Sequence, residues 1–232
     1  MHPAHGFYPG PVSRVLSVNI ARPRPNPAKT TGLTGIDKVP TGDAVTVRAP
    51  GPMRSGLGSG LTDDVIGNKK LHGGDDQAVY AYAREDLDQW QTKLHRPLAN
   101  GNFGENFSTC GVDVTGAHIG ERWQVGTGGL LLEVTAPRTP CRTFAAFLEI
   151  PDLIKTFTAA AVPGAYLRVI RPGMVRAGDE VTVLHRPDHG ITVGFVFRAI
   201  TREPDLLPRL LGIDALPHDI TKMARERSAK QA

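Results

Sequence analysis

The chain has 232 residues, of which 40% are hydrophobic and 22% are charged, and this composition excludes a disordered or collagen-like protein. Its formal net charge of +4 is only mildly basic, and the densest run of Lys and Arg, at residues 222–230, is interrupted by Glu226 and contains no aromatic residue. The composition therefore argues against nucleic acid as a partner, while a mild positive charge suits an acidic small ligand.

We expect neither a membrane segment nor a secretory leader in this sequence. No apolar stretch is long enough to span a bilayer, and residues 1–11 lack the apolar core of a signal peptide. We therefore expect no membrane partner and a cytoplasmic location, where thiols stay reduced. The two cysteines, Cys110 and Cys141, are then expected to be free thiols.

The first half of the chain predicts short strands separated by turns, and one clear helix. Residues 12–20 and 43–48 are rich in β-branched residues and predict strands, and the proline-punctuated residues 22–31 between them predict a loop. Residues 77–83 fit either a strand or the start of a helix. Residues 84–94 predict a helix, because their apolar side chains recur at helical spacing.

The second half predicts more strands and then a helical tail. The expected strands are residues 111–114, 121–125, 130–135, 165–170 and 180–184, and the expected helices are residues 143–148 and 152–161. Residues 193–200 fit a strand by their β-branched residues, or a helix by Thr192 as its N-cap. Two apolar stripes follow, one at Leu206, Leu207, Leu210 and Leu211 and one at Ile220 and Met223, and they predict helices from about residue 191 onward.

The segment most informative about chemistry places a cysteine between two arginines. Cys141 follows a predicted strand at a turn that Pro137 and Pro140 hold in a rigid, extended form. Arg138 and Arg142 would favour the thiolate, which is the form that binds metals or attacks electrophiles. From this segment alone, an activated cysteine and a loop cysteine beside two solvated arginines are equally good interpretations.

Two further segments carry polar groups suited to a ligand. Residues 102–107 place amides, a carboxylate and two aromatic rings around one glycine, so they could bind the edge of a heterocycle, although an Asn-rich turn explains the segment by itself. Residues 69–75 combine two lysines, His72 and two glycines, which allows the backbone to approach an anion closely. The spacing of His and Cys does not match a zinc site.

Together these segments resemble the MOSC family, named for the C-terminal domain of molybdenum-cofactor sulfurases, and in particular its stand-alone bacterial branch that reduces N-hydroxylated nucleobases. The resemblance is carried by residues 72–74, 78–82, 104–109, 119–122 and, most specifically, 135–141. It implies a mainly β fold with α-helices (α+β), in which a closed, mainly antiparallel β-barrel is surrounded by peripheral helices. It also implies a MOSC β-barrel domain at residues 1–190 and a three-helix extension at residues 191–232.

The resemblance implies a site for the molybdenum cofactor (molybdopterin). Cys141 falls on the family's cysteine and is expected to be the metal ligand and the catalytic residue. The residues expected to hold the pterin and its phosphate are Lys70, His72, Gly73, Asn102, Phe103, Asn106, Arg138, Thr139 and Arg142. A soft thiolate suits molybdenum already bound by a dithiolene, and arginine offers bidentate donors to phosphate. Cys110 has no counterpart in the family's motifs and is expected to be structural or incidental.

The implied function is a two-electron reduction that removes oxygen from small N-hydroxylated molecules such as hydroxylaminopurines, a detoxification of N-hydroxylated bases. Two cysteines cannot also hold an iron–sulfur cluster, so a separate electron-donor protein is expected as partner. Two alternatives remain open: a sulfur carrier with a persulfide on Cys141, and a cofactor-binding module without turnover. The apolar helical tail is a candidate surface for a homodimer.

Overall fold

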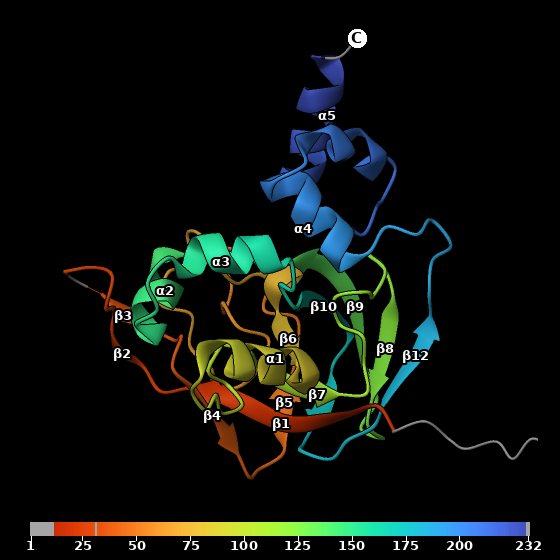
Figure 1. The fold of residues 1–232 in the computed structure, drawn as a ribbon. Coiled ribbons are helices and arrows are strands. Elements are labelled where there is room, and N and C mark those ends of the chain that lie inside the picture. Colours follow the sequence, from red (N-terminus) through yellow and green to blue (C-terminus); the bar gives the residue numbers. More distant parts are fainter. Residues whose placement is uncertain (1–11, 31, 231–232) are drawn as a thin grey trace, which may run out of the picture.

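The computed structural model describes residues 12–30 and 32–230 and places one large, strongly curved sheet against several short helices (Figure 1). The predicted absence of a signal peptide concerns residues 1–11 and lies outside the described residues. Among the described helices, none combines the length and the apolar character that crossing a bilayer requires.

Eight strands form the main sheet, in the order β12-β8-β9-β10-β6-β7-β1-β4. Their bounds are β1 (Arg14–Ala21), β4 (Lys38–Thr41), β6 (Val79–Ala83), β7 (Phe107–Cys110), β8 (Arg122–Val125), β9 (Leu130–Pro137), β10 (Ala165–Arg171) and β12 (Val181–His185). Neighbouring strands are antiparallel except β6 and β7, which are parallel because the chain crosses over between them through helix α1 (Arg84–Leu94). Two small sheets pair β2 (Arg24–Pro25) with β3 (Leu33–Thr34) and β5 (Val45–Val47) with β11 (Gly173–Val175).

The expected closed barrel is not confirmed. Over the described residues the strand pairing is an open series from β12 to β4, so no ladder joins the first strand of the order to the last. The sheet nevertheless curls, because Arg14 forms an isolated bridge with Glu180 and the N–H of Val181 donates to the carbonyl of Ser13 at 2.8 Å. The start of β1 therefore lies beside the start of β12.

The helices largely follow the predicted pattern. The prediction at residues 84–94 is confirmed by α1, and the other helices are α2 (Arg142–Leu148), α3 (Leu153–Ala160), α4 (Val193–Thr201) and α5 (His218–Ala229). Three residues of the leucine stripe lie in a 3-10 helix, η2 (Pro204–Leu210), in which Leu207 and Leu210 are buried and Pro208 interrupts regular α-helical bonding, whereas Leu211 follows this helix and is exposed. The strand expected at residues 111–114 is wrong: the chain bends at Gly111, whose φ is +69°, and continues irregularly into a turn that begins at Val114.

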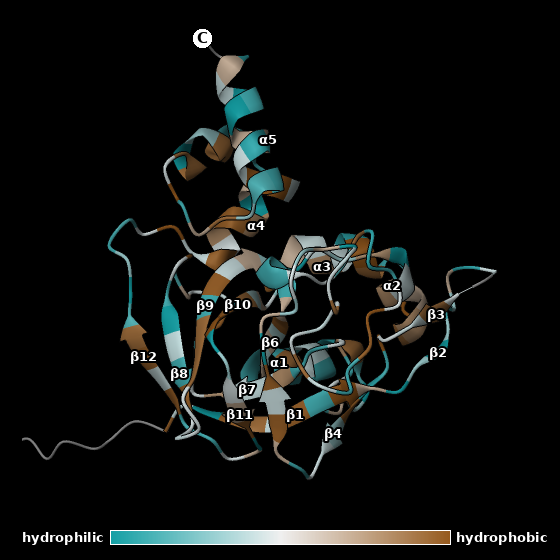
Figure 2. Cartoon of the chain, turned by 180° about the vertical axis from the view of Figure 1, so that it is seen from behind, coloured by the Kyte–Doolittle hydropathy of each residue, from teal (hydrophilic) through white to brown (hydrophobic). Residues whose placement is uncertain are grey.

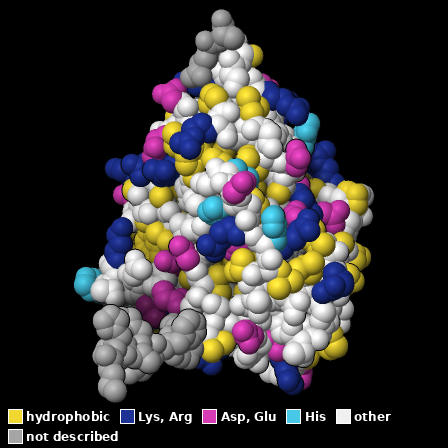
Figure 3. All heavy atoms as spheres, turned by 90° about the vertical axis from the view of Figure 1, so that its right-hand side faces the viewer, with side chains coloured by type: hydrophobic (Ala, Val, Ile, Leu, Met, Phe, Trp, Pro, Cys, Tyr) yellow, Lys and Arg dark blue, Asp and Glu magenta, His cyan; other side chains and the backbone are white. Residues whose placement is uncertain are grey.

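Two apolar clusters fill the interior. One lies in the concave side of the sheet and continues into α4, η2 and α5 through Val196, Leu210 and Ile220. The other is aromatic and joins α1, α2 and α3 to β6. Coloured by hydropathy, β9 and α4 are mainly hydrophobic, whereas α5 is largely hydrophilic (Figure 2). On the face that includes β12, acidic and basic side chains are interspersed (Figure 3). The expected boundary between a β-barrel domain at residues 1–190 and a helical extension at residues 191–232 stays a prediction.

The ambiguous residues 193–200 are helical because Thr192 caps them. The Thr192 hydroxyl accepts a hydrogen bond from the N–H of Phe195 at 3.0 Å, which satisfies one of the free donors at the start of α4. We predict that Thr192→Ala lowers the free energy of unfolding by about 1 kcal/mol in urea titrations. Thr192→Ser keeps the hydroxyl and should stay close to wild type, and equal losses in both variants would contradict the role of the cap.

Candidate functional site

A cavity of about 250 Å³ opens between the segment after β3, the segment that precedes η1 (Asp75–Gln77), and the turn between β9 and α2. Among the described residues that line it there is no Asp or Glu, whereas the basic side chains are Lys29, His72, Arg138, Arg142 and Lys38, the last of which is paired with Asp64 behind the wall. An anionic ligand would therefore meet a wall of positive charge there.

The structure brings six of the predicted site residues to this wall and leaves four away from it. The residues that line the cavity are His72, Gly73, Asn106, Arg138, Cys141 and Arg142. The residues that do not are Lys70, Asn102, Phe103 and Thr139.

Each of these four residues has a different surrounding. Phe103 is fully buried in the aromatic cluster, with its ring centroid 5.1 Å from those of Tyr82 and Phe144. The side-chain oxygen of Asn102 accepts the N–H of Ala99 at 2.8 Å and so closes a turn. Lys70 and Thr139 are exposed to solvent. A pattern of residue types in sequence could not distinguish a core aromatic or a turn amide from a ligand contact.

Cys141 lies at the N-cap position of α2, in extended backbone. Burial alone would raise the pKa of its thiol, but a hydrogen bond with His72, the charge of Arg138 and the backbone N–H of Phe144 outweigh burial and lower that pKa to about 7. A large fraction of Cys141 is therefore thiolate at neutral pH. Cys110, at the end of β7, is also a free thiol but does not line the cavity.

Arg138 is the buried cation of the site. Its side chain is held between two rings, with the guanidinium carbon 3.9 Å from the ring centroid of Phe144 and 5.4 Å from that of Tyr80. Burial alone would lower its pKa, but the neighbouring Tyr80, Tyr166 and Cys141 raise it, so the group stays charged. Its buried Nη1 has no hydrogen-bond partner among the described residues. A buried donor without a partner is costly, and a bound anion would satisfy it.

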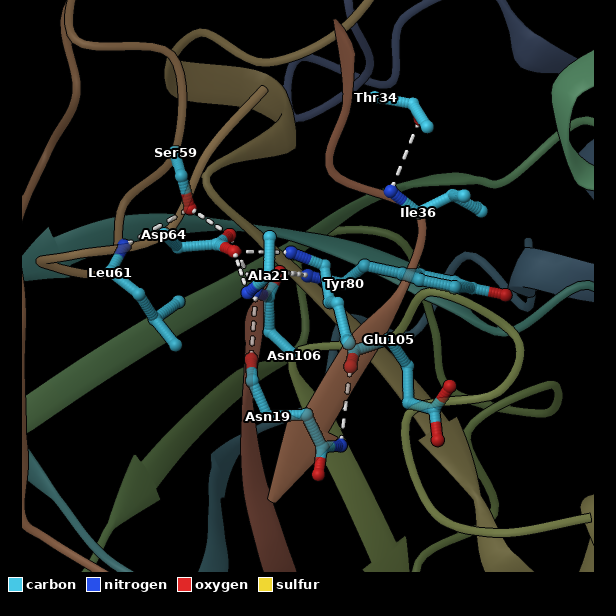
Figure 4. Close-up of polar contacts among 11 residues, drawn as sticks. Asn19, Ala21, Thr34, Ile36, Ser59, Leu61, Asp64, Tyr80, Glu105 and Asn106 are labelled. Carbon is cyan, nitrogen blue, oxygen red and sulfur yellow. Dashed lines mark hydrogen bonds and ion pairs between the residues drawn. The ribbon is translucent and has the colours of Figure 1, made fainter. Parts of the chain in front are cut away.

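A buried carboxylate, Asp64, does not line the cavity itself but binds two residues that do, Lys38 and Asn106. Figure 4 shows Ser59, Ala21 and Asn106 converging on it, with hydrogen bonds of 2.6, 2.8 and 2.9 Å. The ammonium of Lys38 completes the set at 2.5 Å. Burial alone would raise the pKa of Asp64, but the ion pair with Lys38 and these donors hold it below its usual value. The pairing of Lys38 with Asp64 has no local signature in the sequence.

The predicted site residue Asn106 is engaged with protein groups. Its side-chain amide donates to Asp64 and to the carbonyl of Asn19, and its side-chain oxygen accepts the N–H of Tyr80 at 3.1 Å (Figure 4). Both amide hydrogens are therefore used, so Asn106 holds the wall in place. Its neighbour Glu105 is fully buried and accepts the N–H groups of Gly101 and Phe103, which fixes the loop.

Gly73 allows the His72 turn to approach a second loop. Its φ is +83°, and a Cβ at this position would lie 2.6 Å from the carbonyl oxygen of Gly58. We predict that Gly73→Ala lowers the free energy of unfolding by roughly 2–3 kcal/mol, through both backbone strain and this clash. Gly178→Ala is the matched control, because its φ is +92° but nothing lies within 4 Å. Equal losses in the two variants, measured by chemical denaturation, would contradict the clash.

The fold and the site define an α+β protein with a basic cavity beside an activated thiol. Residues 68–182 match the model of the MOSC domain. Protein YflK of Bacillus subtilis (strain 168), an uncharacterized protein, is 31% identical over 185 residues, which cover 79% of each chain. Protein YiiM of Escherichia coli (strain K12) is 31% identical over 132 residues, which are 55% of this chain and 57% of that one. A protein described as a reductase from Gibberella moniliformis is 29% identical over 120 residues, 50% of this chain and 21% of that one.

Solved structures of two YiiM proteins share the fold of this chain. The crystal structure of YiiM from Geobacillus stearothermophilus superposes with a TM-score of 0.74 at 25% identity and covers 93% of this chain and 98% of that chain. The structure of YiiM from Escherichia coli has a TM-score of 0.70 at 21% identity, over 96% and 95% of the two chains, and supports the fold. The chain belongs to the MOSC family, and this membership indicates a molybdenum-cofactor-associated function of the oxidoreductase type.

Proposed function

We propose that the protein is a molybdenum-cofactor-dependent reductase of small N-hydroxylated compounds, such as hydroxylaminopurines, in which Cys141 is the thiolate ligand of the metal. The observation that carries the proposal is the placement of the activated Cys141 thiol beside the buried Arg138, in a cavity that no described carboxylate lines. Membership of the MOSC family supports the choice of cofactor.

The residues present fit this cofactor. Molybdenum that is already bound by the two sulfurs of a pterin suits one additional soft ligand, and the Cys141 thiolate is such a ligand. The phosphate of the pterin requires cationic donors, and Lys29, Arg138 and Arg142 line the cavity without an ion pair to any described carboxylate. Arg138 would hold the phosphate with a donor that has no protein partner.

The reaction consumes two electrons and two protons: the N–O bond of an N–OH group breaks, an N–H bond forms, and water leaves. The bound cofactor supplies the redox chemistry. The protein keeps the thiol deprotonated through His72 and Arg138, binds the anionic cofactor with the basic wall, and holds that wall in place through Asp64 and Asn106. The electrons come from a separate electron-donor protein.

A sulfur carrier is the second candidate, because the same observation favours it. A thiol whose pKa is lowered to about 7 can also hold a persulfide and transfer its sulfur. A cofactor-binding module without turnover would have the same cavity.

One experiment separates the three functions. The protein is purified from a host that makes the cofactor, and molybdenum, cyanolysable sulfur and the conversion of hydroxylaminopurine to aminopurine are measured, with dithionite-reduced methyl viologen as electron donor. A reductase contains stoichiometric molybdenum and turns over, and Cys141→Ser abolishes turnover whereas Cys110→Ser does not. Persulfide sulfur without stoichiometric molybdenum would indicate the carrier. Molybdenum without turnover on any N-hydroxylated substrate would indicate the module.

A further inference from the structure

Arg168, on β10, contacts three parts of the chain that are far apart in sequence. Its Nε and Nη2 donate to one carboxylate oxygen of Asp76 at 3.0 and 2.5 Å, and its Nη1 donates to Glu133 on β9 at 3.0 Å. Its Nη2 also donates to the carbonyl of Ala215, between η2 and α5, at 3.3 Å. Asp76 and Ala215 are 139 positions apart in sequence, and this guanidinium binds both of them directly.

Asp76 belongs to the unit that carries the His72 turn. It lies in η1, and its backbone carbonyl accepts the hydroxyl of Thr135 at 2.7 Å. Within the unit, the N–H of Gly73 donates to the side chain of Gln77 at 3.2 Å, and the N–H of Gln77 donates to the carbonyl of Gly74 at 3.0 Å. Residues 73–77, which directly follow His72, are therefore tied to one another, and the contacts of Asp76 anchor them to the sheet.

The other end of the link is the C-terminal helical segment. In Figure 1, α4 and α5 stand beyond the ends of β9 and β10, and the segment returns toward the sheet between them. Arg168 meets this segment at Ala215, next to Leu216, which is buried in the sheet core. The same guanidinium thus binds both η1, which follows the His72 turn, and the C-terminal segment.

We propose that Arg168 is a positioning residue, which holds the His72 turn against Cys141 through Asp76 and couples that turn to the C-terminal segment through Ala215. The proposal rests on the proposed function, because the His72 turn that Arg168 would hold belongs to the proposed cofactor site. Arg168 is 26% exposed and Asp76 is 37% exposed, so solvent weakens their ion pair and a moderate effect is expected.

The test is local hydrogen–deuterium exchange, measured by mass spectrometry on the full chain free of cofactor. In Arg168→Met, peptides that cover residues 70–78 and 212–217 are expected to exchange roughly three- to tenfold faster, because local opening no longer breaks the ion pair. The matched control is Arg122→Met. Arg122, on β8, donates to the same Glu133 at 3.0 Å but forms no hydrogen bond or ion pair with Asp76 or Ala215 in the described structure, so Arg122→Met should leave both peptides unchanged.

Two more variants test whether Arg168 positions the His72 turn or only contributes to the stability of the whole fold. Asp76→Asn removes the carboxylate but keeps the bonds from Arg168 to Glu133 and Ala215, so it should speed exchange at residues 70–78 and leave residues 212–217 unchanged. Arg168→Lys can reach Asp76 with one ammonium but cannot hold three acceptors, so it should restore part of the protection at residues 70–78 only.

Molybdenum per chain, measured on the same variants from a cofactor-competent host, should fall several-fold in Arg168→Met and stay at the wild-type value in Arg122→Met. Equal exchange in the two variants, or faster exchange spread evenly over the sheet, would overturn the proposal. Wild-type protein without molybdenum would instead count against the proposed function, and the exchange result would stand independently.

Discussion

Asp64→Asn is expected to lower the free energy of unfolding by about 3–5 kcal/mol, because it leaves the buried ammonium of Lys38 without a counter-charge. The side chain of Asp64 is fully buried, that of Lys38 is 5% exposed, and their charged atoms are 2.5 Å apart. The measurement is urea denaturation at pH 7. The matched control is Asp37→Asn: Asp37 pairs with the exposed Arg22 and Arg24, so its loss should cost at most about 1 kcal/mol.

Asp64→Asn should also change how the free energy of unfolding depends on pH. Because the pKa of Asp64 is held below its usual value in the folded protein, its contribution is fully present above the unfolded pKa, near 4, and disappears as the pH falls through the lower folded pKa. Wild-type stability should therefore fall more steeply than that of Asp64→Asn below about pH 4. A constant difference between the two proteins from pH 7 to pH 3 would contradict this account.

Arg138→Met is expected to raise the pKa of Cys141 from about 7 toward the ordinary thiol range, because it removes a nearby positive charge. At pH 7 the thiolate fraction should fall from about half by several-fold or more, and the alkylation of Cys141 by iodoacetamide should slow in proportion. The measurement is the alkylation rate against pH in cofactor-free protein, with Cys110→Ser as the background. Methionine keeps the packing against Phe144.

Arg142→Met is the control for this prediction. Arg142 adjoins Cys141 in sequence and lines the cavity, but its side chain is exposed and solvent screens its charge. Its loss should move the alkylation midpoint little. If the two arginine variants shift the midpoint equally, the activation of Cys141 does not depend on burial of Arg138.

Secondary structure could be predicted from the sequence where a segment carries a single signal, such as one clear apolar periodicity. Residues 84–94 repeat apolar side chains at helical spacing and form α1 with these bounds, and the strong run at residues 130–135 lies in β9. Residues 193–200 were ambiguous because β-branched side chains favour a strand and an N-cap favours a helix. The structure has the helix, with the N-cap hydrogen bond of Thr192 at its start. The segment at residues 111–114 looked like a strand, but a left-handed glycine begins it.

The candidate site could be predicted only in part, because the same polar residue types bind ligands in one place and hold turns or the core in another. Cys141 and Arg138 were identifiable because the prolines and the arginines are adjacent in sequence, and they do meet at the cavity. Asp64 and Lys38 were missed, because strand β4 and the segment of Asp64 approach only in the folded chain. Phe103 was assigned to the ligand because an aromatic beside amides suits a pterin, whereas the structure buries it among other rings.

The central claim is that Cys141 is the protein ligand of molybdenum, and metal analysis of purified protein tests it most directly. Wild type, Cys141→Ser and Cys110→Ser are produced in the same cofactor-competent host, and molybdenum per chain is measured by mass spectrometry after matched purification. We predict stoichiometric molybdenum in wild type and in Cys110→Ser, and at least a tenfold loss in Cys141→Ser, because a neutral hydroxyl is a poor substitute for a soft thiolate. Equal molybdenum in wild type and Cys141→Ser would contradict the assignment.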